Sequence, residues 1–424
     1  MFPLATNNKA REESMKKPWF QLTAALTAMV MIANLQYAWT LFVEPMRAAN
    51  MWQRSELNAA FALFIFLQTF VQPLDGWLMD RMGPRIFITI AGVFCGFGWS
   101  LLGYAETITQ VKIYYALAGI GAAFVYSGCV GSALKWYPTR RGFAAGLIAA
   151  GFGGGSGVLN ILIRYMVPTY GYKITFLYTG IVQGLIIAIV AQFLRHPDAS
   201  FVPPKAAAAA STKSRRNAEN FTTGEMLGKP HFYILYLMFV TVATGGLYLT
   251  ANQASIAGDW NMAGIVGTIV VLGPLANGAS RIFWGWVSDS LGRENTMVVA
   301  FLLQAISLVS VATIGRQSAT LFAITLTATF FTWGEVYALF PSTLGDYFGS
   351  KFATSNYGFL YTAKGVAAYI GPYLGSRLVE ANGGDFGAVF YGCAVLALVG
   401  CVFAFIMRTR PLPHKESTAA TQTA

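Results

Sequence analysis

The sequence predicts an all-α membrane protein whose twelve transmembrane helices form two bundles of six. Three observations lead to this prediction. The composition is too apolar for a surface that faces water, apolar runs long enough to span a bilayer recur along the whole chain, and the two halves share a short internal repeat. Together these observations exclude a water-soluble globular domain.

Composition is the first of these observations. Of the 424 residues, 55% are hydrophobic and 11% are charged, and the mean hydropathy is +0.52, whereas a soluble domain usually carries about 25% charged residues. The 62 aromatic residues and 44 glycines suit helices that pack in lipid with aromatic belts at the interfaces. The four cysteines show no CxxC spacing and the three histidines fall in expected loops or tails, so we expect no disulfide framework and no metal or haem site.

The apolar runs define the expected helices. A helix that crosses a bilayer needs roughly 20 mostly apolar residues. The runs lie near 19–43, 56–79, 86–104, 109–134, 142–165, 173–194, 231–254, 264–287, 296–314, 318–344, 354–378 and 386–407. The first run is too long for the apolar region of a signal peptide and lacks a clear cleavage site, so we expect it to remain as the first helix.

Lysine and arginine residues set the expected orientation. With both termini in the cytoplasm, 20 of the 29 fall on the cytoplasmic side, 7 fall on the opposite side, and 2 lie within spans. The net charge of +11 is therefore interpreted as a topology signal and not as a sign of nucleic-acid binding. We expect a multi-pass protein of the bacterial inner (plasma) membrane with both termini in the cytoplasm.

The chain divides near its middle. Residues 195–230 are polar, basic and rich in alanine, proline and serine, which is typical of a linker. The expected organisation is a cytoplasmic tail, a six-helix bundle, a cytoplasmic linker, a second six-helix bundle and a second tail, at 1–18, 19–194, 195–230, 231–408 and 409–424.

The internal repeat supports this division. GWLMDRMGPR at 76–85 and GWVSDSLGR at 285–293 align with an offset of 209, and Gly146 and Gly358 mark a second echo with an offset of 212. Two related halves predict a substrate site between them at the middle of the membrane. An ordinary tight turn with solvated charges is the alternative interpretation of each segment.

These segments carry a family resemblance. GWLMDRMGPR resembles the signature loop between helices 2 and 3 of major facilitator transporters, and GWVSDSLGR resembles its weaker copy between helices 8 and 9. The resemblance implies the major facilitator fold and a conformational latch between the two halves on the cytoplasmic face. The residues that it assigns to the latch are Gly76, Asp80, Arg81, Gly83, Arg85, Asp289 and Arg293.

Two cations remain inside the expected spans, Arg281 in the eighth and Lys364 in the eleventh. An ionisable side chain at this depth costs roughly 2.5–3.5 kcal/mol on insertion scales, so it persists where it faces a cavity or a partner. Lys364 lies about ten residues inside its span, roughly 15 Å deep, while Arg281 is about two turns from Asp289. A structural ion pair or snorkelling to the interface is the alternative, but we expect both residues to bind substrate.

Few acidic residues lie in the spans to neutralise these cations. Glu335, in the tenth span, is about 200° around a helix from both Trp333 and Tyr337, so it points away from a cavity that those two residues line. A small dianion would supply the missing charge. Arg281 would bind one carboxylate bidentately, and Lys364 would act as a point charge on the other.

A second resemblance sharpens this prediction. NLQYAWTLF, NGASRIFWGWVSD, FFTWGEVYALFPS and NYGFLYTAKG are similar to the oxalate/formate antiporter family, and the similarity extends over most of the chain. It implies that Arg281 and Lys364 hold the substrate carboxylates. It also implies a cage of aromatic and amide residues, matched here at Gln36, Tyr37, Tyr126, Trp333 and Tyr337.

The chain departs from that family at three positions. Phe152 stands where a tyrosine is expected, Tyr361 stands where a tryptophan is expected, and Glu335 replaces a glycine beside the cage. These differences change hydrogen bonding and volume, so a carboxylate substrate is better supported than oxalate itself. Taken singly, any aromatic residue in so aromatic a chain is more often a packing residue than a ligand.

Exchange is the expected mode of transport. Two uncompensated cations in an empty cavity resist passage through an occluded, desolvated state, and a bound anion relieves that cost. The two bundles would rock about the central site. The best-supported exchange is that of an oxalate dianion for a formate monoanion. No cofactor, nucleotide or metal is needed. The expected partners are a small organic anion and the lipid bilayer, with no nucleic acid, and the expected state is a monomer.

Three alternatives stay open. Proton-coupled uptake of a monocarboxylate such as lactate or pyruvate would use Glu335 as proton carrier. A membrane receptor or sensor built on the same scaffold is a second alternative. A large soluble output domain would favour it, but the tails at 1–18 and 409–424 are too short for one. A membrane enzyme would need a nucleophile, a metal or paired carboxylates inside the bundle, and the sequence shows no such constellation, so we expect the protein not to be an enzyme.

Overall fold

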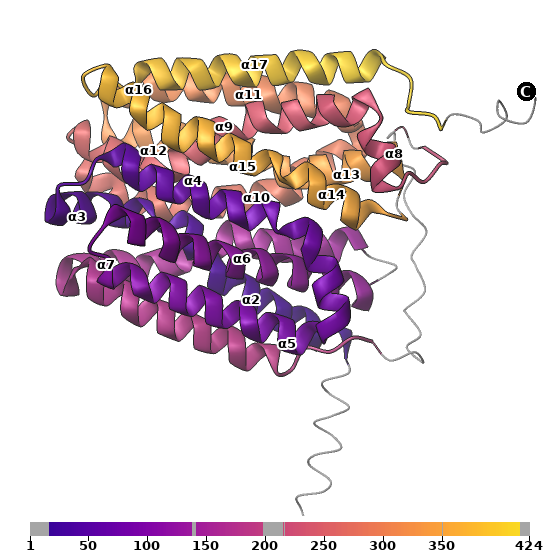
Figure 1. Cartoon of the computed structure of the whole chain (residues 1–424). Coiled ribbons are helices and arrows are strands. Elements are labelled where there is room, and N and C mark those ends of the chain that lie inside the picture. Colours follow the sequence, from indigo (N-terminus) through magenta and orange to yellow (C-terminus); the bar gives the residue numbers. More distant parts are fainter. Residues whose placement is uncertain (1–16, 138–140, 198–214, 216, 350, 416–424) are drawn as a thin grey trace, which may run out of the picture.

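A computed structural model describes residues 17–137, 141–197, 215, 217–349 and 351–415. In this part of the chain the regular structure is entirely helical. The long helices run roughly along one direction, and the helices of the first half of the sequence gather beside those of the second half (Figure 1).

The first half contributes five long or medium helices and one short one. They are α2 (Pro18–Tyr37), α3 (Thr40–Asn50), α4 (Arg54–Phe70), α5 (Gln72–Leu101), α6 (Ile108–Trp136) and α7 (Arg141–Ala191). A turn at Ala38 and Trp39 separates α2 from α3, so the first expected span, 19–43, is interrupted. α3 lies at one end of the bundle, which we call the α3 end (Figure 1).

The second half begins with the short α8 (Thr223–Leu227) and contains more interruptions. Its helices are α9 (Pro230–Asp259), α10 (Val266–Leu291), α11 (Arg293–Ala312), α12 (Ala319–Trp333), α13 (Val336–Phe348), α14 (Ala353–Tyr361), α15 (Ala363–Ala368), the π-helix η4 (Tyr369–Gly375), α16 (Ser376–Ala381) and α17 (Gly387–Thr409). α2 begins and α17 finishes at the end of the bundle opposite α3 (Figure 1).

Ten helices in the described part of the chain are long and apolar enough to cross a membrane. One of these, at 144–191, has 48 residues, and non-helical backbone at Gly171 divides it. The piece before Gly171 packs against α10, where Gly154 meets Gly278, and the piece after it packs against α5, where Gly184 meets Gly96. Because α7 thus supplies two spans and the broken run α14–α16 covers another, the described helices account for the twelve expected spans.

Local sequence explains where several helices begin. α2 and α9 each start with a proline, whose fixed φ suits the first turn and whose missing N–H costs nothing there. The side chain of Thr107 accepts a hydrogen bond from the backbone N–H of Gln110 and caps α6, and Ser318 caps α12 in the same way.

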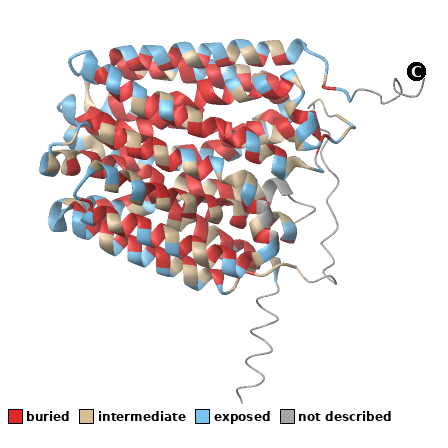
Figure 2. Cartoon of the chain, viewed as in Figure 1, coloured by how far each residue is buried: buried red, intermediate tan, exposed pale blue. Residues whose placement is uncertain are grey.

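The outer surface of the bundle is apolar. Buried residues line the helix faces that meet, and exposed residues follow the ends and outer faces (Figure 2). Large apolar side chains on those outer faces are exposed, among them Ile161, Leu185, Val402 and Phe405. Such a surface suits contact with lipid tails, which is how a membrane bundle is solvated.

The two copies of the internal repeat share one backbone feature. Gly83 has φ +75° and ψ 158°, and Gly292, which is 209 positions later, has φ +89° and ψ 154°. This region of backbone space is open to glycine and strained for other residues, so the repeat specifies the same tight connection in both halves.

The expected latch is only partly described. Gly76 lies within α5, the Asp80 side chain is outside what the structure describes, and Arg81 and Arg85 are exposed. Arg293 donates to Asp289 at 2.9 Å and Asp346 at 3.0 Å, and also to Ser288. These three partners belong to the second half of the chain, so the contacts tie helices within one half, and a latch between halves stays a prediction.

The end of the expected linker packs on the second half. The Arg215 guanidinium donates to the carbonyl oxygens of Arg408 at 3.0 Å and Arg410 at 2.6 Å. Further along, the backbone N–H of Asn217 donates to the carbonyl of Asp346 at 2.8 Å. Residues 198–214 and 216 of the linker lie outside the described residues, and the division of the chain into two bundles, a linker and tails stays a prediction.

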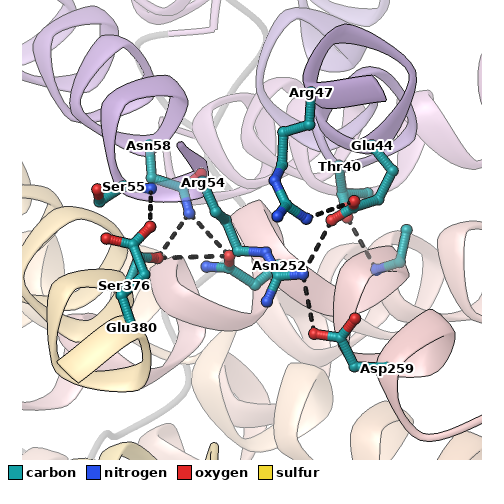
Figure 3. Close-up of polar contacts among 11 residues, drawn as sticks. Thr40, Glu44, Arg47, Arg54, Ser55, Asn58, Asn252, Asp259, Ser376 and Glu380 are labelled. Atoms are coloured by element: carbon teal, nitrogen blue, oxygen red, sulfur yellow. Dashed lines mark hydrogen bonds and ion pairs between the residues drawn. The ribbon is translucent and has the colours of Figure 1, made fainter. Parts of the chain in front are cut away.

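Polar contacts join the two halves at the α3 end (Figure 3). The centre of one group is Arg54 at the start of α4, whose guanidinium lies 3.0 Å from Glu44 of α3 and 2.8 Å from Asp259 at the end of α9. Its side chain is 9% exposed. Arg54 therefore bridges a carboxylate of the first half and one of the second, whereas the ion pair of Arg47 among the described residues is with Glu44 of its own half, at 2.7 Å.

A second group of contacts lies beside the first (Figure 3). Asn58 donates to Asn252 and to Ser376, each at 2.7 Å, and all three residues are buried. The backbone N–H of Ser55 donates to Glu380 at 2.8 Å. We call these contacts, together with the Arg54 ion pairs, the α3-end network. Its bonds connect α3 and α4 to α9 and α16, so they hold the two halves together at this end.

Candidate functional site

Arg281 lies deep in α10 and is 3% exposed. Its guanidinium donates to the carbonyl oxygen of Ala149 in α7 at 2.6 Å and to the side-chain oxygen of Asn277 at 3.0 Å. The guanidinium carbon lies 4.3 Å from the centre of the Tyr337 ring, which is within cation–π distance. The side chain therefore stays inside the bundle, in contact with α7 and α13, and does not snorkel to the interface.

Close packing of α7 on α10 shapes this position. A Cβ atom on Gly153 would lie 3.0 Å from Nε of Arg281, and one on Gly278 would lie 2.8 Å from the backbone nitrogen of Gly154. Glycine at these places lets the two helices approach and leaves room for the guanidinium. The glycine-rich tract of α7 is thus accounted for by packing beside Arg281.

Lys364 is fully buried. Its ammonium donates to the side-chain carbonyl oxygens of Gln36 in α2 and Gln68 in α4, each at 2.8 Å, and to the Tyr361 hydroxyl at 3.3 Å. It also lies 5.3 Å from the centre of the Phe152 ring. Like Arg281, it contacts the other half of the chain, as expected for a site between the halves.

Interruptions in the helix place Lys364 there. α14 ends at Tyr361, α15 begins at Ala363, and the π-helix η4 follows from Tyr369. Irregular turns of this kind are frequent at functional sites. Gly365 allows α15 to lie close to α4, because a Cβ atom there would be 2.7 Å from the Thr69 hydroxyl.

Six of the expected cage residues form one continuous chain of ring contacts. The centres of successive rings are 5.9, 5.6, 5.6, 6.3 and 5.7 Å apart in the order Tyr37, Phe152, Tyr126, Tyr361, Tyr337, Trp333. These distances fit edge-to-face and stacked pairs. Together with Gln36, which bonds to Lys364, the structure brings together all the aromatic and amide residues that the sequence suggested.

Several donors at this centre have no hydrogen-bond partner among the described residues. They are Nε2 of Gln36, Nε2 of Gln68, Nε of Arg281, Nε1 of Trp333 and the Tyr337 hydroxyl. A buried donor without an acceptor costs about 1–3 kcal/mol. A group of donors beside two cations is complementary to a ligand rich in acceptor oxygens, such as a carboxylate.

Within the described residues, no acidic side chain neutralises the two cations. In the described part of the chain neither Arg281 nor Lys364 forms an ion pair. Glu335 is fully buried at the turn between α12 and α13, and both its carboxylate oxygens lack a hydrogen-bond partner within this region. The alternative of a structural ion pair for Arg281 or Lys364 therefore has no partner in the described chain.

Two polar residues of this centre were missed in the sequence. Gln68 lies in an apolar run of α4, and Asn277 lies one turn before Arg281 in α10. The side-chain oxygen of Asn277 accepts from both Arg281 at 3.0 Å and the Tyr37 hydroxyl at 3.2 Å. The i, i+4 spacing of Asn277 and Arg281 was a usable signal, whereas an isolated glutamine such as Gln68 does not reveal which helix it faces.

A bundle of membrane-spanning helices with a polar centre between its two halves is the architecture of secondary transporters. The model of the Major Facilitator Superfamily matches residues 24–253 and 234–423, and the chain belongs to this superfamily. The expected fold class is thereby confirmed, and so is the expectation that the protein is a transporter and not an enzyme.

Relatives narrow the family further. The chain is 34% identical over 397 residues to the oxalate:formate antiporter of Oxalobacter formigenes, which covers 93% of this chain and 92% of the relative. It is 24% identical over 359 residues to the MFS-type transporter YhjX of Escherichia coli, covering 82% and 85% of the two chains. It is also 24% identical over 399 residues, 92% of each chain, to the multidrug resistance protein MdtG of Dickeya zeae. The resemblance to the oxalate/formate antiporter family is confirmed by the first of these matches.

Proposed function

We propose that the protein exchanges small carboxylate anions across the membrane by alternating access, with oxalate dianion and formate monoanion as its substrate pair. Arg281 binds one carboxylate of the dianion and Lys364 attracts the other. The ring chain from Tyr37 to Trp333 encloses the anion and limits its size. We place the protein in the bacterial inner membrane with both termini in the cytoplasm, because the lysine and arginine residues concentrate on that side.

The observation that carries this proposal is the pair of buried cations without an acidic partner in the described chain. Burying one uncompensated charge costs several kcal/mol, and here Arg281 and Lys364 are both buried in the same centre. An anion with two carboxylates would neutralise both and would accept hydrogen bonds from donors such as Nε of Arg281 and Nε1 of Trp333. The name of the 34% identical relative supports the choice of oxalate and formate.

Exchange follows from the same charges. When the centre is empty, closing it from both sides would desolvate two like charges together, and this raises the barrier for the empty carrier. A bound anion removes that barrier, so the carrier crosses loaded in each direction. A dianion that moves against a monoanion carries net charge, and the exchange is therefore electrogenic.

Uptake into proteoliposomes tests the proposal. Vesicles are loaded with oxalate, formate, lactate or buffer, and entry of labelled oxalate is measured for wild type, Lys364→Ala and Lys415→Ala. Lys415 is a matched control, because it is more than a third exposed and pairs with Glu225 at 2.9 Å. We expect uptake only into vesicles that contain oxalate or formate, unchanged in Lys415→Ala and reduced at least about 30-fold in Lys364→Ala, the equivalent of about 2 kcal/mol.

Glu335 favours a second candidate, proton-coupled uptake of a monocarboxylate such as lactate. Its carboxyl group is fully buried and has no hydrogen-bond partner among the described residues, and a carboxyl in such a place can carry a proton. Entry of labelled lactate driven by a pH gradient, with no oxalate uptake, would favour this function. Retention of proton coupling in Glu335→Gln would then exclude Glu335 as the carrier.

A further inference from the structure

The ammonium group of Lys364 is surrounded by neutral oxygen atoms. Its three hydrogen bonds go to the side-chain carbonyls of Gln36 and Gln68 at 2.8 Å and to the Tyr361 hydroxyl at 3.3 Å. A lysine ammonium has three donors, so all of them are used. The hydrogen bonding of Lys364 is therefore complete, while no acidic side chain of the described chain compensates its charge.

Gln68 connects the two halves through this lysine. It lies in α4 and is 1% exposed, and its partner lies in α15. The carbonyl oxygen has to face the ammonium, since the amide NH2 group is a donor and cannot accept from Lys364. The amide nitrogen that remains is buried and has no hydrogen-bond partner within the described chain, so Gln68 presents an acceptor to the lysine and keeps a donor that a ligand could use.

We propose that Gln68 is a positioning residue that, by holding Lys364, restricts this carrier to exchange. Because it is a neutral amide, it holds the Lys364 ammonium in place without cancelling the charge, and the compensating charge has to arrive with a carboxylate. This inference rests on the proposed function and extends it to one residue that the family resemblance did not suggest. Gln36 is less suited to the role, since it adjoins Tyr37 in the cage.

A carboxylate at position 68 would change this balance. Glutamate has nearly the same shape as glutamine, and at 2.8 Å from the ammonium it would form an ion pair with Lys364. The charge of Lys364 would then be compensated inside the protein, even without substrate. The empty carrier could rearrange, and substrate flux would no longer require a counter-substrate.

The rearrangement of the empty protein can be measured without any substrate. Ser55 is 1% exposed in the α3-end network, so a cysteine there reacts with a hydrophilic maleimide only when this end opens. Ser55→Cys is placed in a background in which Cys95, Cys129, Cys393 and Cys401 are replaced by alanine, and the purified protein is labelled at saturating reagent, where the rate reports opening. Gln68→Glu and Gln68→Met are compared with the Ser55→Cys parent.

We expect opening to be at least about fivefold faster in Gln68→Glu and not accelerated to that extent in Gln68→Met, which removes the amide without adding charge. Lys364→Met removes the cation itself and should also accelerate opening, which keeps the test decisive if Gln68→Glu fails to fold. Unchanged opening in a folded Gln68→Glu, or equal acceleration in Gln68→Glu and Gln68→Met, would overturn the inference. If Gln68→Glu does not fold, unchanged opening in Lys364→Met would overturn it.

Measurements of oxalate efflux distinguish a failure of this inference from a failure of the proposed function. Efflux of labelled oxalate from loaded proteoliposomes is measured into buffer with and without external formate. Wild type should need the external anion, and Gln68→Glu should release oxalate into buffer alone at least about fivefold faster than wild type. If wild type exchanges no carboxylate, the proposed function fails and the labelling still decides the role of Gln68. If wild type exchanges while Gln68→Glu neither opens nor leaks faster, the inference fails and the function stands.

Discussion

The side-chain oxygen of Asn277 accepts a hydrogen bond from the guanidinium of Arg281 at 3.0 Å, one helical turn away in α10. The same oxygen accepts from the Tyr37 hydroxyl of α2 at 3.2 Å, while the amide nitrogen donates to the carbonyl of Phe330 in α12 at 3.3 Å. Asn277 thus links three helices and fixes the direction in which Arg281 points, although it need not touch a substrate itself.

Asn277→Ala should weaken substrate binding more than it slows transport. It removes the acceptor that Arg281 and Tyr37 share, which costs about 1–3 kcal/mol. The guanidinium can then turn, because the hydrogen bond left to it within the described chain is the one to the Ala149 carbonyl of α7. We expect KM for the transported anion to rise about tenfold or more, corresponding to about 1.4 kcal/mol, with a smaller change in the maximal rate. Initial uptake rates over a range of substrate concentrations measure both quantities.

Asn295→Ala is the matched control for Asn277→Ala. Asn295 is half-buried, and its amide donates to the carbonyl of Leu291 at the connection between α10 and α11, so its replacement should leave KM unchanged. An unchanged KM in Asn277→Ala as well would show that Arg281 keeps its position without this bond.

The ring of Tyr337 should matter more than its hydroxyl. The guanidinium carbon of Arg281 lies 4.3 Å from the ring centre and the ammonium of Lys364 lies 5.6 Å from it, so the ring face stabilises both cations. Tyr337→Phe keeps the ring and should retain most transport, whereas Tyr337→Leu removes it and should lower uptake about tenfold. Uptake per mole of reconstituted protein is the measurement, and a Phe variant as impaired as the Leu variant would shift the role to the hydroxyl.

The features predicted from the sequence share a physical reason. Apolar runs and isolated charges within them are visible in a linear sequence, because lipid penalises charge wherever the helix turns. The membrane spans and the two cations inside them, Arg281 and Lys364, could therefore be predicted from the sequence alone. The assembly of Tyr126, Phe152 and Tyr361 into one chain of rings was expected only through resemblance to a family.

Contacts between distant helices could not be predicted in this way. Gln68 and Asn277 are amides in apolar runs, and their roles depend on which helix lies opposite. In the sequence, Arg54 is one of seven basic residues on one side of the membrane. Its partner Asp259 lies about two hundred positions later and becomes its neighbour where the two halves meet at the α3 end. The breaks in the helix near Lys364 could not be predicted either, because the apolar pattern treats 354–378 as one continuous helix.

Gly334 should tolerate no side chain. It lies at the turn between α12 and α13, and a Cβ atom there would overlap the Ser280 hydroxyl and lie 2.5 Å from the carbonyl oxygen of Asn277. Gly334→Ala should push α12 and α13 away from α10, lower the melting temperature and reduce transport strongly.

Gly345→Ala in α13 is the control, because a Cβ atom there meets nothing within 4 Å, and alanine should raise helix stability by about 0.5–1 kcal/mol. Equal melting temperatures for the two variants would contradict the contact at Gly334.

Arg54 should control opening at the α3 end. It is shared between Glu44 of the first half and Asp259 of the second, at 3.0 and 2.8 Å, and removing it leaves two carboxylates that no longer attract the same cation. The closed state at this end should lose about 1–3 kcal/mol relative to the open state, since a charge-assisted bond across the halves is lost while bonds within each half remain. We expect labelling of Ser55→Cys by a hydrophilic maleimide to be several-fold faster in Arg54→Ala. Arg47→Ala is the control, because the ion pair that Arg47 forms within the described chain is with Glu44 of its own half, so its loss breaks no described ion pair between the halves. Equal labelling rates in the two variants would mean that the buried contacts of Asn58 with Asn252 and Ser376, and not the ion pairs, keep this end closed.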